Sequence, residues 1–181
     1  MARPSFSEYW MASAELAASR STCDRAHVGC VLVKDNRQIS AGYNGSISGQ
    51  VHCDQAGHLL VNDRCQRTIH SEMNALLTAA RHGISVAGTI CFVTHFPCWG
   101  CFKALLNAGV NKIVFKEFKL GGYTRATYDA VIACRGQVSI TDKAGMDLFL
   151  YTPIYEEKSF GPNAFIAANG NDILKQLKLG V

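Results

Sequence analysis

Hydrophobic and polar positions alternate in two periods along most of the chain. Residues 6–20 carry aromatic, Leu and Ala positions at helical spacing, which predicts a first helix packed on a core. Residues 28–33 are apolar and β-branched, residues 35–37 are polar, and apolar positions return over residues 38–43. Two such runs around a short polar turn predict a β-hairpin.

The second part of the pattern predicts alternating helices and strands. We expect helices at 72–82, 97–109 and 124–134, with Gly83 capping the first, and strands at 89–94, 112–118 and 137–141. A helix between the last two strands implies a right-handed crossover and parallel pairing. The sequence therefore predicts an α/β fold of three α/β/α layers. Its five-stranded mixed sheet has parallel strands four and five.

The domain organisation follows from the same pattern. We expect one domain over residues 1–181, with its core over about 6–141. Residues 49–66 are rich in Gly, His, Asp and Cys without a clear period, so we interpret them as an irregular insert. Residues 142–181 are expected to be an irregular tail that ends in a short helix at 171–179.

Composition narrows the class of protein. Of 181 residues, 48% are hydrophobic and 18% charged, which is typical of a soluble globular protein. The N-terminus lacks the apolar core of a signal peptide, and no stretch approaches the roughly 18 apolar residues of a membrane span. The net charge of +4 comes from scattered basic residues, which argues against a large nucleic-acid footprint. We expect a cytoplasmic protein with no membrane partner.

The eight cysteines suggest metal binding more than disulfides. Cys30 and Cys91 fall inside apolar strands and Cys134 closes a predicted helix, so these three are expected to be structural. The other five lie near histidines or at x-x spacing: Cys23, Cys53, Cys65, Cys98 and Cys101. Without a signal peptide, metal binding in a reducing compartment is the better interpretation.

The most informative motif joins His70 and Glu72 to a later pair, Cys98 and Cys101. One imidazole and two thiolates are three ligands for Zn²⁺ that leave a fourth position for water, as in catalytic sites. The spacing H-x-E…P-C-x-x-C is the signature of zinc-dependent nucleobase and nucleotide deaminases. The alternative is a structural zinc knuckle, which normally uses four protein ligands and needs no such Glu.

The predicted elements place this motif suitably for catalysis. His70 and Cys98 each precede a helix, so two helix N-termini can converge on one metal and favour thiolate ligands. Zinc lowers the pKa of water, and Glu72 could move protons to the substrate without binding the metal. By itself, Glu72 could equally be an ordinary first-turn carboxylate.

On these residues, the chain resembles the cytidine deaminase superfamily and, within it, the deoxycytidylate (dCMP) deaminases. The resemblance runs over about 21–108, and more loosely to 141, through segments 28–31, 42–45, 52–54, 67–75 and 94–98. It implies zinc-dependent hydrolysis of dCMP to dUMP and ammonia, supplying dUMP for thymidylate synthesis. The family more often has Ala at Ser71, and the implied role there is a backbone N–H that bonds the pyrimidine carbonyl.

The resemblance also implies substrate contacts beyond the motif. Asn44 should bond the sugar hydroxyl, although an Asn before Gly45 is also common in left-handed turns. The 5′-phosphate needs cationic or hydroxyl partners. The candidates, each of which could instead be a solvated surface residue, are Arg25, Arg67, Tyr123 and Arg125.

A second zinc site is implied in the insert, since several dCMP deaminases carry a non-catalytic zinc there. Cys23, Cys53, His58 and Cys65 offer four ligands, with His52 as the competing nitrogen. The alternative is reduced cysteines with surface histidines. If zinc binds, it should fix a loop that cannot build its own core.

Assembly and regulation are implied by the family only. Members are often homohexamers that dCTP activates and dTTP inhibits, with Mg²⁺ as a possible companion of the nucleotide effector. Arg81 and Gly45 lie where such members bind the effector near a subunit contact, although Arg81 could simply complement its helix C-terminus.

Two other functions compete with a dCMP deaminase. A nucleic-acid deaminase of the tRNA adenosine type shares both halves of the motif, but the Cys/His insert and the lack of a basic stripe argue against it. An inert zinc-binding regulatory protein would have no use for Glu72. An assay across dCMP, dCTP, deoxycytidine and adenosine in RNA discriminates among these.

Overall fold

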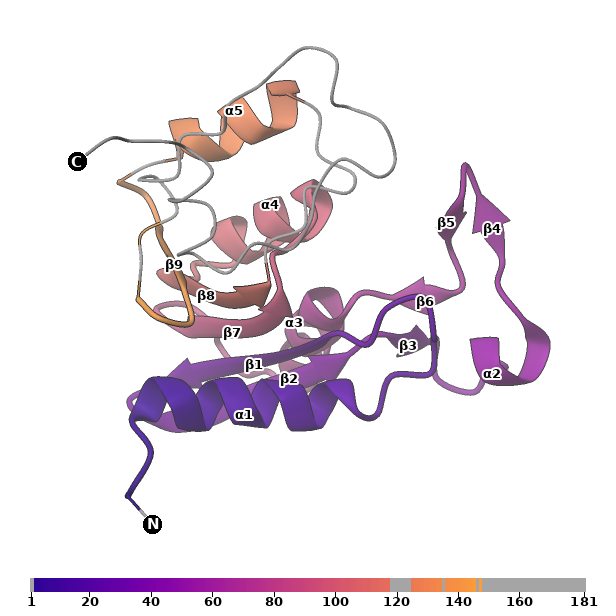
Figure 1. Ribbon diagram of the computed structural model, residues 1–181, viewed down its shortest axis with the longest axis horizontal. Helices are drawn as coiled ribbons and strands as arrows, with labels where there is room; N and C mark the ends of the chain where they lie inside the picture. Colours follow the sequence, from indigo (N-terminus) through magenta and orange to yellow (C-terminus); the bar gives the residue numbers. More distant parts are fainter. Residues whose placement is uncertain (1, 118–124, 135, 146, 148–181) are drawn as a thin grey trace.

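The computed structural model describes residues 2–117, 125–134, 136–145 and 147. Its main sheet has five strands in the order β2-β1-β7-β8-β9 (Figure 1). These strands are β1 (Gly29–Lys34), β2 (Arg37–Tyr43), β7 (Ile90–His95), β8 (Lys112–Glu117) and β9 (Ser139–Asp142). β1 pairs antiparallel with β2 and β7, while β7–β8 and β8–β9 are parallel. The predicted hairpin and the parallel fourth and fifth strands are confirmed.

Four helices support this sheet, and all four were predicted. They are α1 (Phe6–Ala18), α3 (Ser71–Arg81), α4 (Trp99–Asn107) and α5 (Arg125–Ala133). α1 lies along one face of the sheet, whereas residues of the other three pack on the opposite face (Figure 1). The three-layer α/β/α architecture is therefore confirmed.

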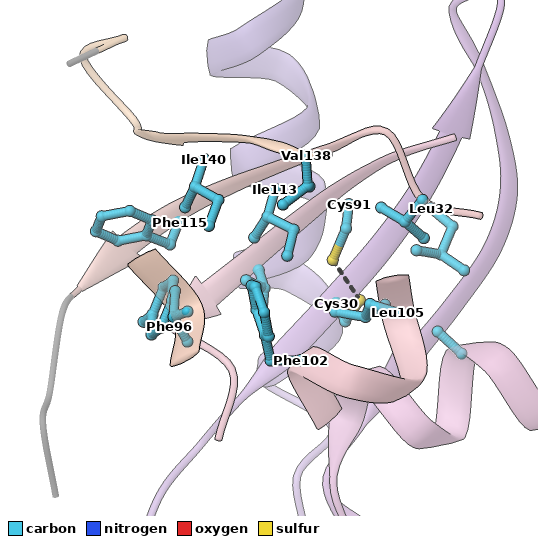
Figure 2. Close-up of a cluster of buried hydrophobic side chains, with 14 residues drawn as sticks. Cys30, Leu32, Cys91, Phe96, Phe102, Leu105, Ile113, Phe115, Val138 and Ile140 are labelled. Carbon is cyan, nitrogen blue, oxygen red and sulfur yellow. Dashed lines mark hydrogen bonds between the residues drawn. The ribbon is translucent and has the colours of Figure 1, made fainter. Parts of the chain in front are cut away.

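The alternation of side chains along the strands separates two buried clusters. On β1, Cys30 and Leu32 point into the cluster that includes Phe102 and Leu105 of α4, whereas Val31 points toward α1. Figure 2 shows the first cluster. There the Sγ atoms of Cys30 and Cys91 are 3.5 Å apart, and both residues are fully buried. Both cysteines are core residues, as predicted.

A close backbone approach places α3 against the sheet. A Cβ at Gly42 would overlap the carbonyl oxygen of Ser71 and the backbone nitrogen of Ala75. Only glycine therefore lets β2 lie so near the first turn of α3. Ser40, two residues earlier on β2, donates its hydroxyl to the carbonyl of Ala75 at 2.7 Å. The start of α3 is fixed by backbone packing before any metal is considered.

The insert at residues 49–66 corrects the prediction of an irregular segment. It contains a short helix, α2 (Cys53–Ala56), and a hairpin of β4 (Leu60–Val61) and β5 (Arg64–Cys65) that projects from the main sheet (Figure 1). Asn62 and Asp63 have φ of 48° and 57°, the conformation that a tight two-residue hairpin turn needs. Beside it, β3 (Gly45–Ser46) pairs antiparallel with β6 (Thr68–Ile69).

Two remaining predictions concern the C-terminal tail and membrane-spanning segments. The expected helix at 171–179 and nearly all of the expected tail lie outside the described residues. Within the described part of the chain, none of the helices combines the length and the hydrophobicity that crossing a bilayer requires.

Candidate active site

The three predicted ligands of the first site come together at two helix N-termini. His70 is the N-cap residue of α3 and Cys98 that of α4, and neither uses its side chain to cap the helix. Nδ1 of His70 lies 3.4 Å from Sγ of Cys98 and 3.5 Å from Sγ of Cys101. The three donor atoms lie within 4.8 Å of one another. One imidazole nitrogen and two sulfurs at these separations fit a zinc ion with an open position.

The electrostatics of this cluster favour a cation. Hydrogen bonds from the Cys101 thiol and then from His70 lower the pKa of Cys98 to about 3, against the effect of burial. The shared hydrogen bond with Cys98 raises the pKa of Cys101, and the contact with Cys98 also raises the pKa of His70. The two sulfurs thus compete for one proton, and a metal ion that replaces this proton would stabilise both as thiolates.

Glu72 lies in the first turn of α3 and is buried, with only 3% of its surface exposed. Burial raises the pKa of this carboxyl, while its own backbone amide, His70 and the Ser71 hydroxyl oppose the change. Ser71, which is fully buried, donates its hydroxyl to Oε2 of Glu72 at 3.0 Å. A buried carboxylate with a raised pKa beside three side chains that could hold a metal ion is suited to accept and return protons.

Asn44 is held at the end of β2 by its amide. Its Oδ1 accepts from the backbone nitrogen of Val28 at 2.7 Å, and its Nδ2 donates to the carbonyl of Ala26 at 2.6 Å. The left-handed alternative for Asn44 is wrong, because this residue is absent from those with positive φ. Each bond leaves the amide one further hydrogen or lone pair, so the side chain can still bond a substrate.

A pocket of about 330 Å³ joins these residues. Asn44, Ser71, Glu72, His70 and Cys98 line it together. The size is that of a small-molecule site, and polar groups converge on it from three elements. The structure thus brings together the predicted catalytic and substrate-binding residues.

The insert and the loop after α1 supply further residues of the pocket wall. Cys23, Arg25, Asp63, Arg64 and Cys65 also line the pocket. The sequence interpretation missed Arg64, because the hairpin that turns it toward the pocket was not predicted. The Asn62-Asp63 pair, two residues that tolerate left-handed geometry, was the available signal for that turn.

The second predicted ligand set also forms a cluster. The donor atoms of Cys23, Cys53, His58 and Cys65, here named the insert cluster, lie within 4.8 Å of one another. Sγ of Cys23 is 3.7 Å from Nδ1 of His58, and Sγ of Cys53 is 3.6 Å from Sγ of Cys65. His52 is not a member of this cluster. Three sulfurs and one nitrogen are the chemistry of a closed zinc site.

Protonation in the insert cluster is uneven, as in the first cluster. Burial and the hydrogen bond with Cys65 raise the pKa of Cys53 to about 12. Burial also acts to raise the pKa of Cys65, but hydrogen bonds led by the backbone amide of Arg67 and by His58 lower it to about 6. The lowered pKa of Cys65 favours the thiolate form, which is the form that binds a cation.

Other predicted residues are not brought to the pocket. Arg67 donates its Nε to the carbonyl of Gly57 at 2.9 Å and is not among the residues that line the pocket. Tyr123 and the side chain of Arg125 lie outside the part of the protein that the structure describes.

The two candidate effector residues are separated within the chain. Gly45 pairs with Ile69 just before the start of α3, whereas Arg81 is the last residue of this 11-residue helix, about 15 Å along the axis from its first residue. Gly45 therefore lies near the start of α3 and Arg81 at its end.

Comparisons with known proteins agree with this geometry. The family model for the cytidine and deoxycytidylate deaminase zinc-binding region matches residues 4–117. ComE operon protein 2 of Bacillus subtilis is 41% identical over 143 residues, which are 78% of this chain and 76% of that protein. Deoxycytidylate deaminase of Schizosaccharomyces pombe is 34% identical over 160 residues, which cover 83% of this chain but 45% of that protein. This chain therefore spans less than half the length of the fission yeast relative.

Solved structures give the same result. The crystal structure of dCMP deaminase from the cyanophage S-TIM5, in complex with dCMP and dUMP, superposes with a TM-score of 0.64 at 29% identity. The match covers 78% of this chain and 99% of that one. Together with the metal-binding geometry and the family match over most of the described fold, these likenesses show that the chain belongs to the cytidine and deoxycytidylate deaminase family.

Proposed function

We propose that this protein is a hydrolase that deaminates dCMP to dUMP and ammonia in a zinc-dependent reaction. The observation that carries the proposal is buried Glu72 beside His70, Cys98 and Cys101 in a pocket that also holds Asn44 and two arginines. The S. pombe relative named deoxycytidylate deaminase and the cyanophage enzyme with bound dCMP and dUMP support the choice of substrate.

The catalytic roles follow from position. Zinc held by His70, Cys98 and Cys101 would supply a Lewis acid that makes water nucleophilic near neutral pH. Glu72 takes a proton from the attacking water and delivers protons to the ring nitrogen and to the departing amine. Burial raises the pKa of Glu72 and so favours its protonated form between these two transfers. A solvated carboxylate with an ordinary pKa would lose this proton to water more readily.

The nucleoside part of the substrate is assigned to two residues. The backbone N–H of Ser71 is in the first turn of α3, where helix amides have no intrahelical acceptor, so it can donate to the pyrimidine carbonyl. The Asn44 amide retains bonding capacity and is assigned to the sugar hydroxyl. Both residues are buried and held by backbone contacts, which reduces the entropy lost on binding.

The phosphate is assigned to Arg25 and Arg64, the arginines that line the pocket. Guanidinium groups bond phosphate oxygens through charge-assisted hydrogen bonds. Arg25 is oriented by Asp63, whose carbonyl accepts from Nη2 at 2.7 Å. Of the phosphate candidates from the sequence, Arg25 is kept, and Arg64 replaces Arg67.

The insert cluster is proposed to hold a second zinc. Its four donors are close enough to surround one ion, and Nε2 of His58 lies 3.0 Å from Oδ1 of Asp24. Metal-ligating histidines usually donate their other ring nitrogen to a carboxylate, which fixes the tautomer. The opposite nitrogen, Nδ1, then faces the three sulfurs.

The proposals for domain organisation, assembly and regulation rest on the family resemblance. We propose a single cytoplasmic domain over residues 1–181 in a homohexamer that dCTP activates and dTTP inhibits, with Mg²⁺ bound alongside the nucleotide effector. We place the effector near a subunit contact, with Gly45 beside the start of α3 and Arg81 at its end.

A substrate panel tests the proposal. The kcat/KM for dCMP is expected to exceed that for deoxycytidine by orders of magnitude, because unsatisfied phosphate-binding groups penalise the nucleoside. dCTP and adenosine in a tRNA stem-loop should be poor substrates. Equal kcat/KM for dCMP and deoxycytidine would contradict the assignment of dCMP as the substrate, but not the assignment of the protein as a deaminase. Efficient deamination of the stem-loop would favour the nucleic-acid enzyme instead.

A further inference from the structure

The insert cluster lies in the wall of the active-site pocket. Two of its members, Cys23 and Cys65, line the same pocket as His70 and Glu72. The cluster joins three separate segments, because Cys23 follows α1, Cys53 begins α2 and Cys65 ends β5. A metal ion bound there would therefore connect the insert to the domain at the edge of the substrate cavity.

Both pocket arginines are next to members of this cluster in the chain. Arg64 directly precedes Cys65, and Arg25 follows Cys23 by two residues. Nη2 of Arg25 also donates to the carbonyl of Asp63 at 2.7 Å and lies 3.4 Å from its Oδ1, which ties the loop after α1 to the hairpin turn. Any displacement of Cys23 or Cys65 would move a guanidinium group at the pocket.

Asp24 completes this connection. It stands between Cys23 and Arg25, and its carboxylate lies 3.0 Å from Nε2 of His58. Three consecutive residues thus have three linked roles. Cys23 is a metal ligand, Asp24 orients the ligand His58, and Arg25 is a cation at the pocket. The side chain of Asp24 is 84% exposed, so it contributes no packing that would explain its position.

Apolar packing contributes little to holding the insert in place. Among the described residues, neither of the two buried apolar clusters includes a member of 49–66. Four apolar side chains of the insert are at least half exposed: Val51, Leu59, Leu60 and Val61. Its hairpin strands are two residues long each, which is too short for stability on their own.

We infer that zinc in the insert cluster positions Arg25 and Arg64 for the substrate phosphate, so that occupancy of this site sets the affinity for the monophosphate nucleotide. This inference rests on the proposed function. Without the ion, the two arginines would sample many orientations and would have to be ordered on binding, which reduces affinity. Asp24 is a positioning residue that acts through His58. The chemical step depends on the other cluster, so the loss should fall on KM and not on kcat.

The test combines zinc content with binding of dUMP, which requires no turnover. In Cys53→Ser, zinc should fall from two ions per chain to one. The Kd of dUMP should rise about tenfold or more, as expected when charge-assisted bonds lose their preorganised donors. The KM for dCMP should rise with it while kcat changes little. Cys134→Ser is the matched control, because that sulfur bonds only the helix carbonyl of Ala130 at 3.3 Å among the described contacts.

A second pair of variants keeps the test valid if Cys53→Ser does not fold. Asp24→Ala should weaken zinc at the insert cluster by about 10- to 100-fold, as for other groups that orient a ligand, while Asp24→Asn retains an acceptor and should behave like the original protein. In Asp24→Ala, dUMP affinity should recover as zinc is added.

Specific outcomes would overturn the inference. Original protein with one zinc per chain, a one-zinc Cys53→Ser that binds dUMP normally, or dUMP affinity in Asp24→Ala that ignores added zinc would each contradict it. Failure of the proposed substrate looks different, because the original two-zinc protein would then bind dUMP and deoxyuridine equally.

Discussion

The two Cys/His clusters of this protein have similar donor atoms but different supports. His70, Cys98 and Cys101 lie at the starts of α3 and α4, helices whose residues Ala75 and Phe102 are fully buried against the sheet. The insert cluster takes three of its four members from a segment with a four-residue helix and two-residue strands. The packed helices α3 and α4 position the first cluster. By contrast, a metal ion in the insert cluster is proposed to stabilise the insert.

The carboxylates beside the two clusters differ in the same way. Glu72 is 3% exposed, and burial raises its pKa. The side chain of Asp24 is 84% exposed and contacts the outer nitrogen of His58. A buried carboxylate can exchange protons with a substrate, whereas an exposed one behind a ligand can only orient it. We therefore assign the proposed reaction to the cluster of His70, Cys98 and Cys101.

The largest expected effect is that of Glu72→Gln. Since the amide cannot accept a proton from water, kcat should fall by about 10²- to 10⁴-fold or more while zinc content is unchanged. Kinetics on dCMP and elemental analysis of the same sample check this. Glu15→Gln is the matched control, because that carboxylate pairs with Lys116 on the opposite side of the sheet. Near-normal kcat in a zinc-replete Glu72→Gln protein would show that Glu72 does not transfer protons in the reaction. The proposed difference between Glu72 and Asp24 would then be wrong.

Loss of a ligand from each cluster tests their supports. His70→Ala should lose one zinc and its activity, yet keep the protease resistance of residues 49–66, since α3 and α4 remain packed in the core. Cys53→Ser should lose the other zinc and become sensitive to protease within the insert, because metal binding and folding are coupled there. Limited proteolysis with mass spectrometry locates the cuts. Equal protection of the insert in both variants would contradict the proposed role of its metal.

The same contrast explains how far the sequence could predict this structure. The main strands and helices were found because burial on both faces of the sheet leaves long apolar runs, such as Val31 and Leu32 pointing to opposite clusters. The ligands of the first cluster were found because H-x-E and C-x-x-C are local spacings at helix starts. Both signals are carried by residues close together in the chain.

The insert could not be predicted in this way. Two-residue strands are too short to show a period, so β4 and β5 were missed and Arg64 with them. The role of the Asn44 amide in bridging Val28 and Ala26 was missed too, because it depends on distances across 16 and 18 residues. Sequence separation does not report such distances.

Gly42→Ala tests the scaffold itself. The added methyl group would overlap the Ser71 carbonyl and force β2 and α3 apart, so the free energy of unfolding should fall by about 1–3 kcal/mol. Denaturant unfolding measures this. Gly100→Ala is the matched control, because its Cβ would meet only the Cys98 sulfur at 3.9 Å and helix propensity favours Ala. A neutral Gly42→Ala would show that the start of α3 is less tightly held than the packing indicates.

The smallest effect concerns the Ser71 hydroxyl, which donates to Oε2 of Glu72 at 3.0 Å. A single hydrogen bond contributes about 0.5–1.5 kcal/mol, so Ser71→Ala should lower kcat by roughly tenfold at most. The KM for dCMP should change little, since the backbone N–H remains. Burial raises the pKa of Glu72 and this bond lowers it, so its removal should raise that pKa further.

The sign of the pH effect follows from which form of Glu72 starts the reaction. The carboxylate must be ionised to accept a proton from water, so a higher pKa should move the acidic limb of the kcat profile to higher pH. Ser40→Ala is the matched control, since it removes another buried hydroxyl that bonds α3, at the Ala75 carbonyl, without touching Glu72. If both variants shift the acidic limb equally, the effect comes from loosening α3, and the Ser71 hydroxyl has no separate influence on the carboxylate.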